Sequence, residues 1–287
     1  MGDVYINDTS LDMSHDYNIT FNDLEFKKIE FIKYVVTCII ICIGLPLTLV
    51  AIYALYSLVR KDHVAPIYVI NLLISDLIQF CCMIGWVAKS EDSNTYNIGR
   101  FIYFSSLMAS VGFMVCIALE RYLVIACPLW YRFRRTIKSS VVVCVLVWVF
   151  THLFFFTSFL WHVPAFYITW FIFSLLPLPL LIFFLVGTLK ALSASISVPA
   201  DEKRRIVAML VLVLLIYTLL FLPRIIRHLK TNLNDMTLGI LSDVFIKLSP
   251  LADLVLYIFM RKGAIDKLLA SVCCCRMDSN DVSSSTV

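Results

Sequence analysis

Long runs of apolar residues, separated by short polar stretches, dominate the chain from about residue 31 onward. Seven of these runs are long enough to cross a bilayer as a helix, which takes about 20 residues. We place them at 32–58, 65–87, 100–126, 139–161, 165–190, 206–226 and 238–260. Backbone groups in hydrocarbon must be paired within a helix or a closed barrel, and these runs are too long for barrel strands. The predicted fold class is therefore an all-α membrane protein, a bundle of seven transmembrane helices.

Composition supports this prediction and excludes other classes. The chain has 287 residues, of which 61% are hydrophobic and 15% are charged. Soluble proteins usually carry about 45–50% apolar and about 25% charged residues. A soluble fold would leave much of this apolar surface in water, so an ordinary cytosolic enzyme is excluded. The net charge of +4 comes without a long basic tract, so no nucleic-acid partner is expected.

The pattern divides the chain into four parts. Residues 1–30 form a polar tail, 31–260 the bundle, 261–275 an amphipathic segment and 276–287 a second tail. In the amphipathic segment, apolar residues recur at helical spacing, which predicts a short helix lying on the inner membrane surface. It ends in Cys273, Cys274 and Cys275, a candidate palmitoylation cluster. A metal site is the alternative, but three adjacent thiols fit ligand spacing poorly.

Loop charges and two sequence motifs predict the orientation in the membrane. Cytoplasmic loops carry an excess of Lys and Arg. The richer set comprises Arg60, Lys61, Arg132, Arg134, Arg135, Lys138, Lys190, Lys203, Arg204, Arg205, Arg261 and Lys262. Asn7 and Asn18 begin tripeptides of the N-glycosylation pattern, which is used outside the cell. We expect the N-terminus outside and the C-terminus inside. No cysteine falls in an outer stretch, so no structural disulfide is expected.

Several short motifs, each in its own predicted helix, resemble those of one family. Leu119-Glu120-Arg121-Tyr122 closes the third segment and is similar to the Asp/Glu-Arg-Tyr motif of rhodopsin-like (class A) G-protein-coupled receptors. The other matches, at family spacing, are Asn71-Leu72-Leu73-Ile74-Ser75-Asp76, Pro128, Trp148, Phe221-Leu222-Pro223 and Asp253-Leu254-Val255-Leu256-Tyr257. Ile43-Gly44-Leu45-Pro46-Leu47, Ala126-Cys127-Pro128-Leu129-Trp130-Tyr131 and Asp253 resemble the branch that holds nucleotide, protease-activated, proton-sensing and lipid receptors.

The resemblance implies a plasma-membrane receptor that passes a signal from an extracellular ligand to a heterotrimeric G protein. The coupling and switch positions are Glu120, Arg121, Tyr122, Phe221, Pro223 and Tyr257. The Arg121 guanidinium can pair with Glu120 at the inner end of the third helix. Extension of this side chain to the membrane interface, without a signalling role, is the alternative.

Acidic and hydroxyl side chains in the middle of the bundle form a candidate ion site. By alignment with the family, Asp76 faces Ser110, Ser249 and Asp253. Two acids and two hydroxyls in a dry bundle could hold a sodium ion, or share a proton if no ion is bound. The alternative is a neutral hydrogen-bonded network without a bound ion.

Charged residues near the outer ends of helices six and seven form a candidate ligand site. Asp243 and Lys247 are four residues apart, so they share a helix face. They either neutralise each other or present a partly compensated cation to a carboxylate or phosphate. Arg224 and Arg227 form a cationic rim, for interfacial anchoring or for anion recognition. Lys247 has the spacing of the opsin retinal lysine, but Gly99 stands at the counter-ion position, so retinal is not favoured.

Departures from the family pattern favour an alternative role. Thr48 replaces the usual Asn, Phe221 the usual Trp and Leu254 the usual Pro. Without that proline, we expect helix seven to lack its preformed weak point. The alternative keeps the fold but makes the chain a constitutively active or non-signalling partner of another receptor. A transporter would show internal repeats, which are not seen. Membrane lipids, contacted by the basic inner loops, and a receptor oligomer are the other partners considered.

Overall fold

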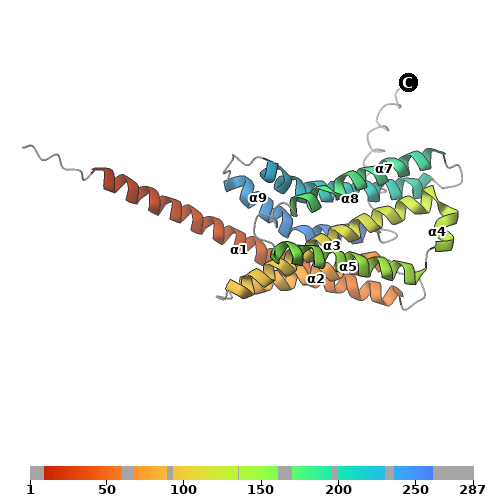
Figure 1. Cartoon of the computed structure of the whole chain (residues 1–287), viewed down its shortest axis with the longest axis horizontal. Helices are drawn as coiled ribbons and strands as arrows, with labels where there is room; N and C mark the ends of the chain where they lie inside the picture. Colours follow the sequence, from red (N-terminus) through yellow and green to blue (C-terminus); the bar gives the residue numbers. More distant parts are fainter. Residues whose placement is uncertain are drawn as a thin grey trace, which may run out of the picture.

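The computed structural model describes residues 10–59, 67–88, 93–134, 136–160, 170–194, 200–229 and 236–260. Within these ranges the regular elements are helices, packed side by side in one bundle (Figure 1). They are α1 (Ser10–Val59), α2 (Ile67–Val87), α3 (Ser93–Ala126), α4 (Pro128–Arg134), α5 (Ile137–Leu160), α7 (Pro177–Ala194), α8 (Ala200–Leu229), α9 (Met236–Lys247) and α10 (Ser249–Met260).

Six helical segments are long and apolar enough to cross a membrane. They are Lys27–Tyr56, Ile67–Val87, Asn94–Ala126, Ile137–Thr157, Trp170–Ser193 and Lys203–Arg227. These agree with the first six predicted segments, and α9 with α10 makes the seventh. The all-α, seven-helix fold class is thereby confirmed. The helix α1 is longer than its predicted span of 32–58, because it starts at Ser10 and extends beyond the bundle (Figure 1).

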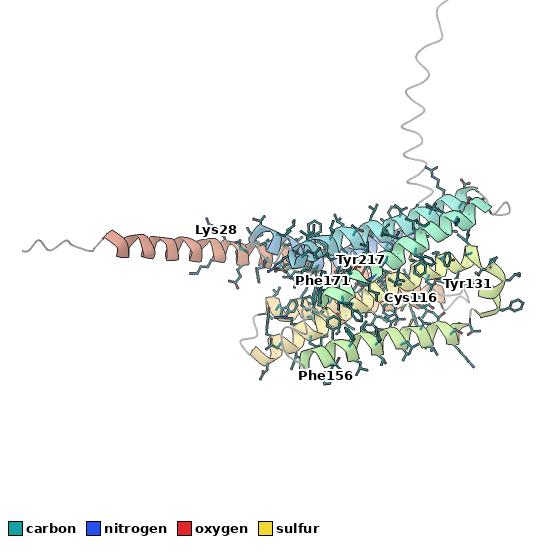
Figure 2. All side chains as sticks on the ribbon, turned by 45° about the horizontal axis from the view of Figure 1, so that its top comes forward. Lys28, Cys116, Tyr131, Phe156, Phe171 and Tyr217 are labelled. Atoms are coloured by element: carbon teal, nitrogen blue, oxygen red, sulfur yellow. The ribbon has the colours of Figure 1, made fainter. Side chains whose placement is uncertain are left out.

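The helix α3 forms the centre of the bundle, and the surrounding helices turn apolar side chains outward. Leu107, Phe113 and Met114 on α3 are fully buried, as is Tyr217 on α8. By contrast, Phe156 on α5 is half exposed (Figure 2). Large exposed apolar side chains on a spanning helix are stable only against lipid. The exposed apolar surface therefore marks the membrane-facing side of the bundle.

The seventh segment is interrupted at Leu248, between α9 and α10. Pro250 has no N–H, so the carbonyl of Ile246 loses its usual helical donor. The Leu248 N–H is shared between the carbonyls of Val244 and Phe245, both at 3.1 Å. The freed Ile246 carbonyl lies 3.4 Å from the Tyr103 hydroxyl of α3, which donates to it. The expectation that this segment lacks a weak point was wrong, because Pro250 supplies one a turn before Leu254.

Two close contacts fix the helices around the centre of the bundle. The Trp148 Nε1–H donates to Asn71 Oδ1 at 3.0 Å and so ties α5 to α2. At Gly44, an added Cβ would lie 2.8 Å from Cε1 of Phe80 and 3.1 Å from Cδ2 of Leu251. Only glycine therefore lets α1 approach α2 and α10 at this level.

We predict that Gly44→Ala destabilises the bundle, because the new methyl group meets the fully buried ring of Phe80. Overpacking of this kind costs about 1–3 kcal/mol. Thermal unfolding of the purified protein measures the effect. Gly85→Ala is the matched control, since nothing lies within 4 Å of its Cβ position. Equal unfolding midpoints for the two variants would contradict the close approach.

Candidate functional site

A cavity of about 590 Å³ opens at the end of the bundle where α9 begins. Its walls combine charged and aromatic side chains from α1, α2, α3, α8 and α9 and from Trp170. The lining residues are Lys33, Trp86, Tyr96, Arg100, Tyr103, Phe104, Trp170, Arg224, Arg227, Asp243, Ile246 and Lys247. Five of these are basic and one is acidic, so the described lining carries a clear excess of positive charge.

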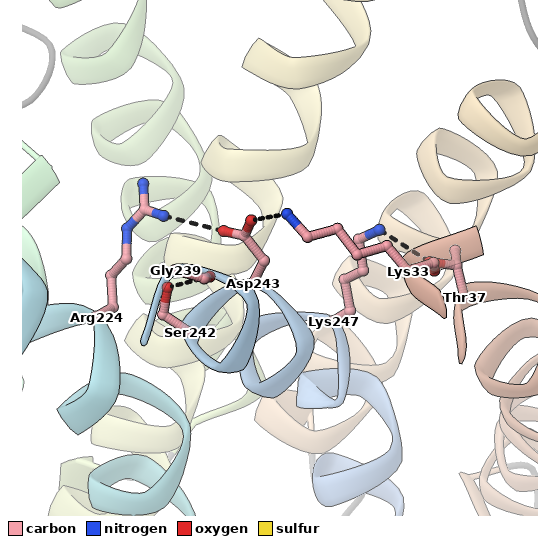
Figure 3. A network of polar contacts seen from close by, with 7 residues as sticks. All are labelled: Lys33, Thr37, Arg224, Gly239, Ser242, Asp243 and Lys247. Atoms are coloured by element: carbon pink, nitrogen blue, oxygen red, sulfur yellow. Dashed lines mark hydrogen bonds and ion pairs between the residues drawn. The ribbon is translucent and has the colours of Figure 1, made fainter. Parts of the chain in front are cut away.

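Asp243 is held by cations from two other helices (Figure 3). Its Oδ2 lies 2.8 Å from Lys33 Nζ of α1, and its Oδ1 lies 3.2 Å from Arg224 Nη1 of α8. Lys247 instead donates to Thr37 Oγ1 at 2.8 Å. Asp243 and Lys247 therefore do not form an ion pair with each other, although both line the cavity. Lys33 and Arg224 contact Asp243 from two other helices.

Sequence reasoning missed Lys33, which lies 210 positions from Asp243 in the chain. A signal was present, because Lys33 is a cation at the start of the first apolar run, where charged side chains are costly. Thr37 donates to the Lys33 carbonyl at 2.6 Å, so both side chains lie on one face of α1. Through Lys33, this face of α1 forms part of the cavity wall.

The two arginines of the predicted rim have different surroundings. The Arg224 guanidinium lies over the Trp170 ring, 5.0 Å from its centroid, in cation–π geometry. Arg227 lies against α9 at Gly239, where an added Cβ would be 3.4 Å from its Cζ. Trp170 also contacts Phe221 on α8, with ring centroids 6.5 Å apart. Arg224 is therefore part of a contact chain that leads from the cavity into the bundle.

Predicted ion-site residues meet deep in the bundle. Asp76 and Asp253 are direct neighbours, and Ser110 Oγ donates to Asp253 Oδ2 at 2.7 Å. Ser249 lies one turn before Asp253 on α10, which places both on one helix face. Gln79, which sequence reasoning missed, lies 3.4 Å from Asp76 Oδ1. All five side chains are fully buried.

Several oxygens of this cluster lack a donor among the described residues. They are Asp76 Oδ2, Asp253 Oδ1 and Ser249 Oγ. Carboxylate and hydroxyl oxygens are the ligands preferred by hard cations such as sodium. Buried oxygens that receive no hydrogen bond fit such an ion, so the residues present suit the predicted group. A proton shared between the two acids satisfies the same oxygens in part.

The predicted coupling residues lie at the opposite end of the bundle, near α4. Glu120 Oε1 accepts a hydrogen bond of 2.6 Å from the Tyr131 hydroxyl of α4. The expected pairing of Arg121 with Glu120 is not formed among the described residues, and Arg121 Nε is buried without a hydrogen-bond partner. Tyr122 packs between α3 and α7, against Phe183 and Phe184.

Two basic residues of α8 close this end of the bundle through bonds to helix carbonyls. Lys203 Nζ donates to the Leu192 carbonyl of α7 at 3.1 Å. Arg205 Nη2 donates to the Met260 carbonyl of α10 at 2.9 Å. Carbonyls at helix C-termini lack intrahelical donors, so cations are favourable there. These two bonds join α8, the sixth spanning helix, to α7 and α10.

The remaining predicted residues divide into described and undescribed ones. Phe221 stacks on Tyr217, with centroids 4.9 Å apart, and Pro223 and Tyr257 are partly buried in α8 and α10. Asn7, the segment 261–275 with Cys273, Cys274 and Cys275, and the tail 276–287 lie outside the described residues. Asn18 belongs to the part of α1 whose side chains are not described.

The described residues thus form a bundle of spanning helices with a charged cavity at one end and the partly buried Arg121 at the other. Residues 47–163 match the family described as 7 transmembrane receptor (rhodopsin family). Over these residues the chain is similar to this rhodopsin-like family, and the relatives that it matches are G-protein coupled receptors and a purinoceptor. Its six long apolar helices are typical of a multi-pass membrane protein, and the relatives that it matches are named as receptors.

Three relatives illustrate the match. G-protein coupled receptor 68 of Bos taurus is 25% identical over 52% of this chain and 41% of the relative. A purinoceptor of Xenopus laevis is 28% identical over 37% of this chain and 21% of the relative. Mas-related G-protein coupled receptor member X1 of Homo sapiens is 31% identical over 40% and 36%. The match spans about two fifths of the length of the first of these relatives.

We predict that Ser110→Ala destabilises the protein, because Asp253 loses a buried hydrogen bond. The loss of one partner of a buried polar group costs about 1–3 kcal/mol. The free energy of unfolding checks this. Ser106→Ala is the matched control, since Ser106 is equally buried but donates only to the Tyr103 carbonyl of its own helix. A Ser106→Ala cost as large as that of Ser110→Ala would argue against the interhelical bond.

Proposed function

We propose that this protein is a G-protein-coupled receptor of the plasma membrane, which transmits binding of a small anionic or lipid-like extracellular ligand to heterotrimeric G proteins. The observation that carries the proposal is the cavity, whose lining has five basic residues and one acidic residue at the end of the bundle away from Arg121. The N-terminus is extracellular and carries sugars on Asn7 and Asn18. The C-terminus is cytoplasmic and is palmitoylated at Cys273, Cys274 and Cys275.

The cavity chemistry supports this class of ligand. Lys247 has no carboxylate partner among the described residues and donates only to a neutral hydroxyl, so its charge is available to an anion. Trp86, Tyr103 and Phe104 provide apolar walls beside it. A ligand with one anionic group and an apolar body satisfies both features, since pockets combine apolar lining with a few orienting polar groups.

A chain of aromatic contacts leads from the cavity to the middle of α8. Arg224 lies on Trp170, Trp170 contacts Phe221, and Phe221 stacks on Tyr217. The Tyr217 hydroxyl donates to the Ser174 carbonyl and so joins α8 to the fifth spanning segment. A ligand that favours one packing of these rings favours the conformations of the bundle in which α8 has the matching position. Such a shift would change the position of α8 relative to Arg121.

We also propose that the cluster of Asp76, Ser110, Ser249 and Asp253 binds a sodium ion in the resting receptor. The buried oxygens without donors support this proposal. The ion would supply positive charge between two acids whose like charges otherwise repel. Its binding would favour the closely packed bundle, because mass action stabilises whichever state binds the ligand.

We predict that Arg121→Ala abolishes ligand-independent signalling in a cell reporter assay with each of the four G-protein classes. The change removes the cation that faces the G protein and leaves the outer cavity intact. Lys138→Ala, an exposed substitution near the same end, is the control and should retain the signal. If the unmodified protein is silent with all four classes, although it reaches the cell surface, the non-signalling partner role replaces this proposal.

We predict that sodium raises the thermal unfolding midpoint of the purified protein relative to choline at equal ionic strength. Asp76→Asn should remove this difference, because it deletes one of the two acids of the site. At 100 times the dissociation constant, binding contributes about 2.7 kcal/mol to the native state. A midpoint that does not depend on the cation would instead favour the shared proton.

A further inference from the structure

Asp243 is the acidic residue among the described lining of the cavity, and its bonding suggests how the proposed ligand acts. We propose that Asp243 is a displaceable internal counter-ion. Its carboxylate holds Arg224 and Lys33 in the resting receptor, and the anionic group of the ligand takes its place on Arg224. This inference rests on the proposed function of the cavity.

The geometry makes Asp243 a bridge between three helices. One carboxylate oxygen contacts Lys33 of α1 and the other contacts Arg224 of α8, while Asp243 itself belongs to α9 (Figure 3). The two contacts use different oxygens, so one can break while the other remains. The loss of the Arg224 contact would remove an ion pair between α8 and α9 and leave the ion pair between α9 and α1 in place.

The exposure of the side chains favours exchange at Arg224. About a third of the side-chain surface of Asp243 is exposed, whereas Arg224 is 14% exposed. Partly exposed ion pairs contribute little net free energy, so Asp243 is cheap to displace into water. The loss of an anionic partner is costly for a largely buried guanidinium, so an incoming anion is favoured on Arg224. A carboxylate or phosphate of the ligand provides it.

Lys247 gives the incoming anion its first contact. It lies one turn from Asp243 on the same helix and lines the same cavity, but it donates to the neutral Thr37. Its charge is therefore compensated less than that of Arg224. The two cations have different roles in this scheme: Lys247 captures the anion, and Arg224 changes partner.

The change of partner reaches the interior of the bundle. Arg224 follows Pro223, where α8 lacks one backbone hydrogen bond, and its guanidinium lies over Trp170. A shift of Arg224 away from Asp243 changes its position on Trp170 and so the contact with Phe221. Displacement at the cavity thereby biases the packing of helix six.

The first experiment uses the full chain in phosphatidylcholine nanodiscs, with dodecyl phosphate as the probe and dodecanol as its uncharged match. Asp243→Asn removes the competing charge and keeps the side-chain shape. We expect dodecyl phosphate to bind about fivefold more tightly or better, within the usual range of coupling between sites. Ligand-independent engagement of G protein should also rise. Asp201→Asn, an exposed acid near the start of α8, is the control and should change neither value.

A second pair of variants decides the question even if Asp243→Asn does not fold. Arg224→Gln removes a cation that is paired with Asp243, and Lys247→Gln removes one that donates to the neutral Thr37. We expect Lys247→Gln to weaken dodecyl phosphate binding more than Arg224→Gln does. In the Arg224→Gln background, Asp243→Asn should give a smaller gain in affinity, because the two residues act on one contact.

The outcomes separate the two proposals. Unchanged or weaker probe binding by Asp243→Asn, or a larger loss with Arg224→Gln than with Lys247→Gln, overturns the counter-ion inference while the anionic ligand site stands. If dodecyl phosphate binds no more tightly than dodecanol to the unmodified chain and to all variants, the proposed ligand class fails as well. G-protein engagement abolished by Arg121→Ala would still support the receptor function in that case.

Discussion

The cost of placing an ionised or hydrogen-bonding group in hydrocarbon decides where this chain can keep its polar residues. The spanning helices are apolar where they face lipid, and the charged groups gather at two ends and in one buried cluster. At one end, Asp243 forms ion pairs with Lys33 and Arg224. In the middle of the bundle, Asp76 lies next to Asp253. At the other end, Lys203 and Arg205 bind helix carbonyls. Several of the polar groups that remain inside, such as Ser110 and Asp253, join helices.

The number and position of the helices could be predicted because hydropathy and helix length are local properties of the sequence. The motif residues of the family also met as expected around Asp253, since helix spacing sets which side chains share a face. Ser110 and Asp253, for example, are bonded across two helices. Most of the fold and the position of the buried cluster could therefore be predicted from the order of the segments.

The partners of individual charges could not be predicted, because they depend on contacts between distant helices. The i, i+4 spacing of Asp243 and Lys247 favoured a local pair, but Lys33 and Arg224 compete better for the carboxylate. Glu120 similarly bonds Tyr131 of α4, a helix too short to stand out in the apolar pattern. The break at Leu248 could not be predicted from the family motif, because Leu254 occupies the position of the family proline and the proline of this helix is Pro250.

The break before Pro250 divides the seventh spanning segment into α9 and α10, so α10 can rotate about Leu248. The inner part, α10, contains 12 residues, which corresponds to about 18 Å of helix beyond the pivot. A rotation of roughly 10° about Leu248 would carry its far end sideways by about 3 Å. Because Arg205 of α8 donates to the Met260 carbonyl at that end, the rotation would pull on the first turns of α8. A pivot at Leu254, nearer the end of α10, would have produced a smaller displacement from the same angle.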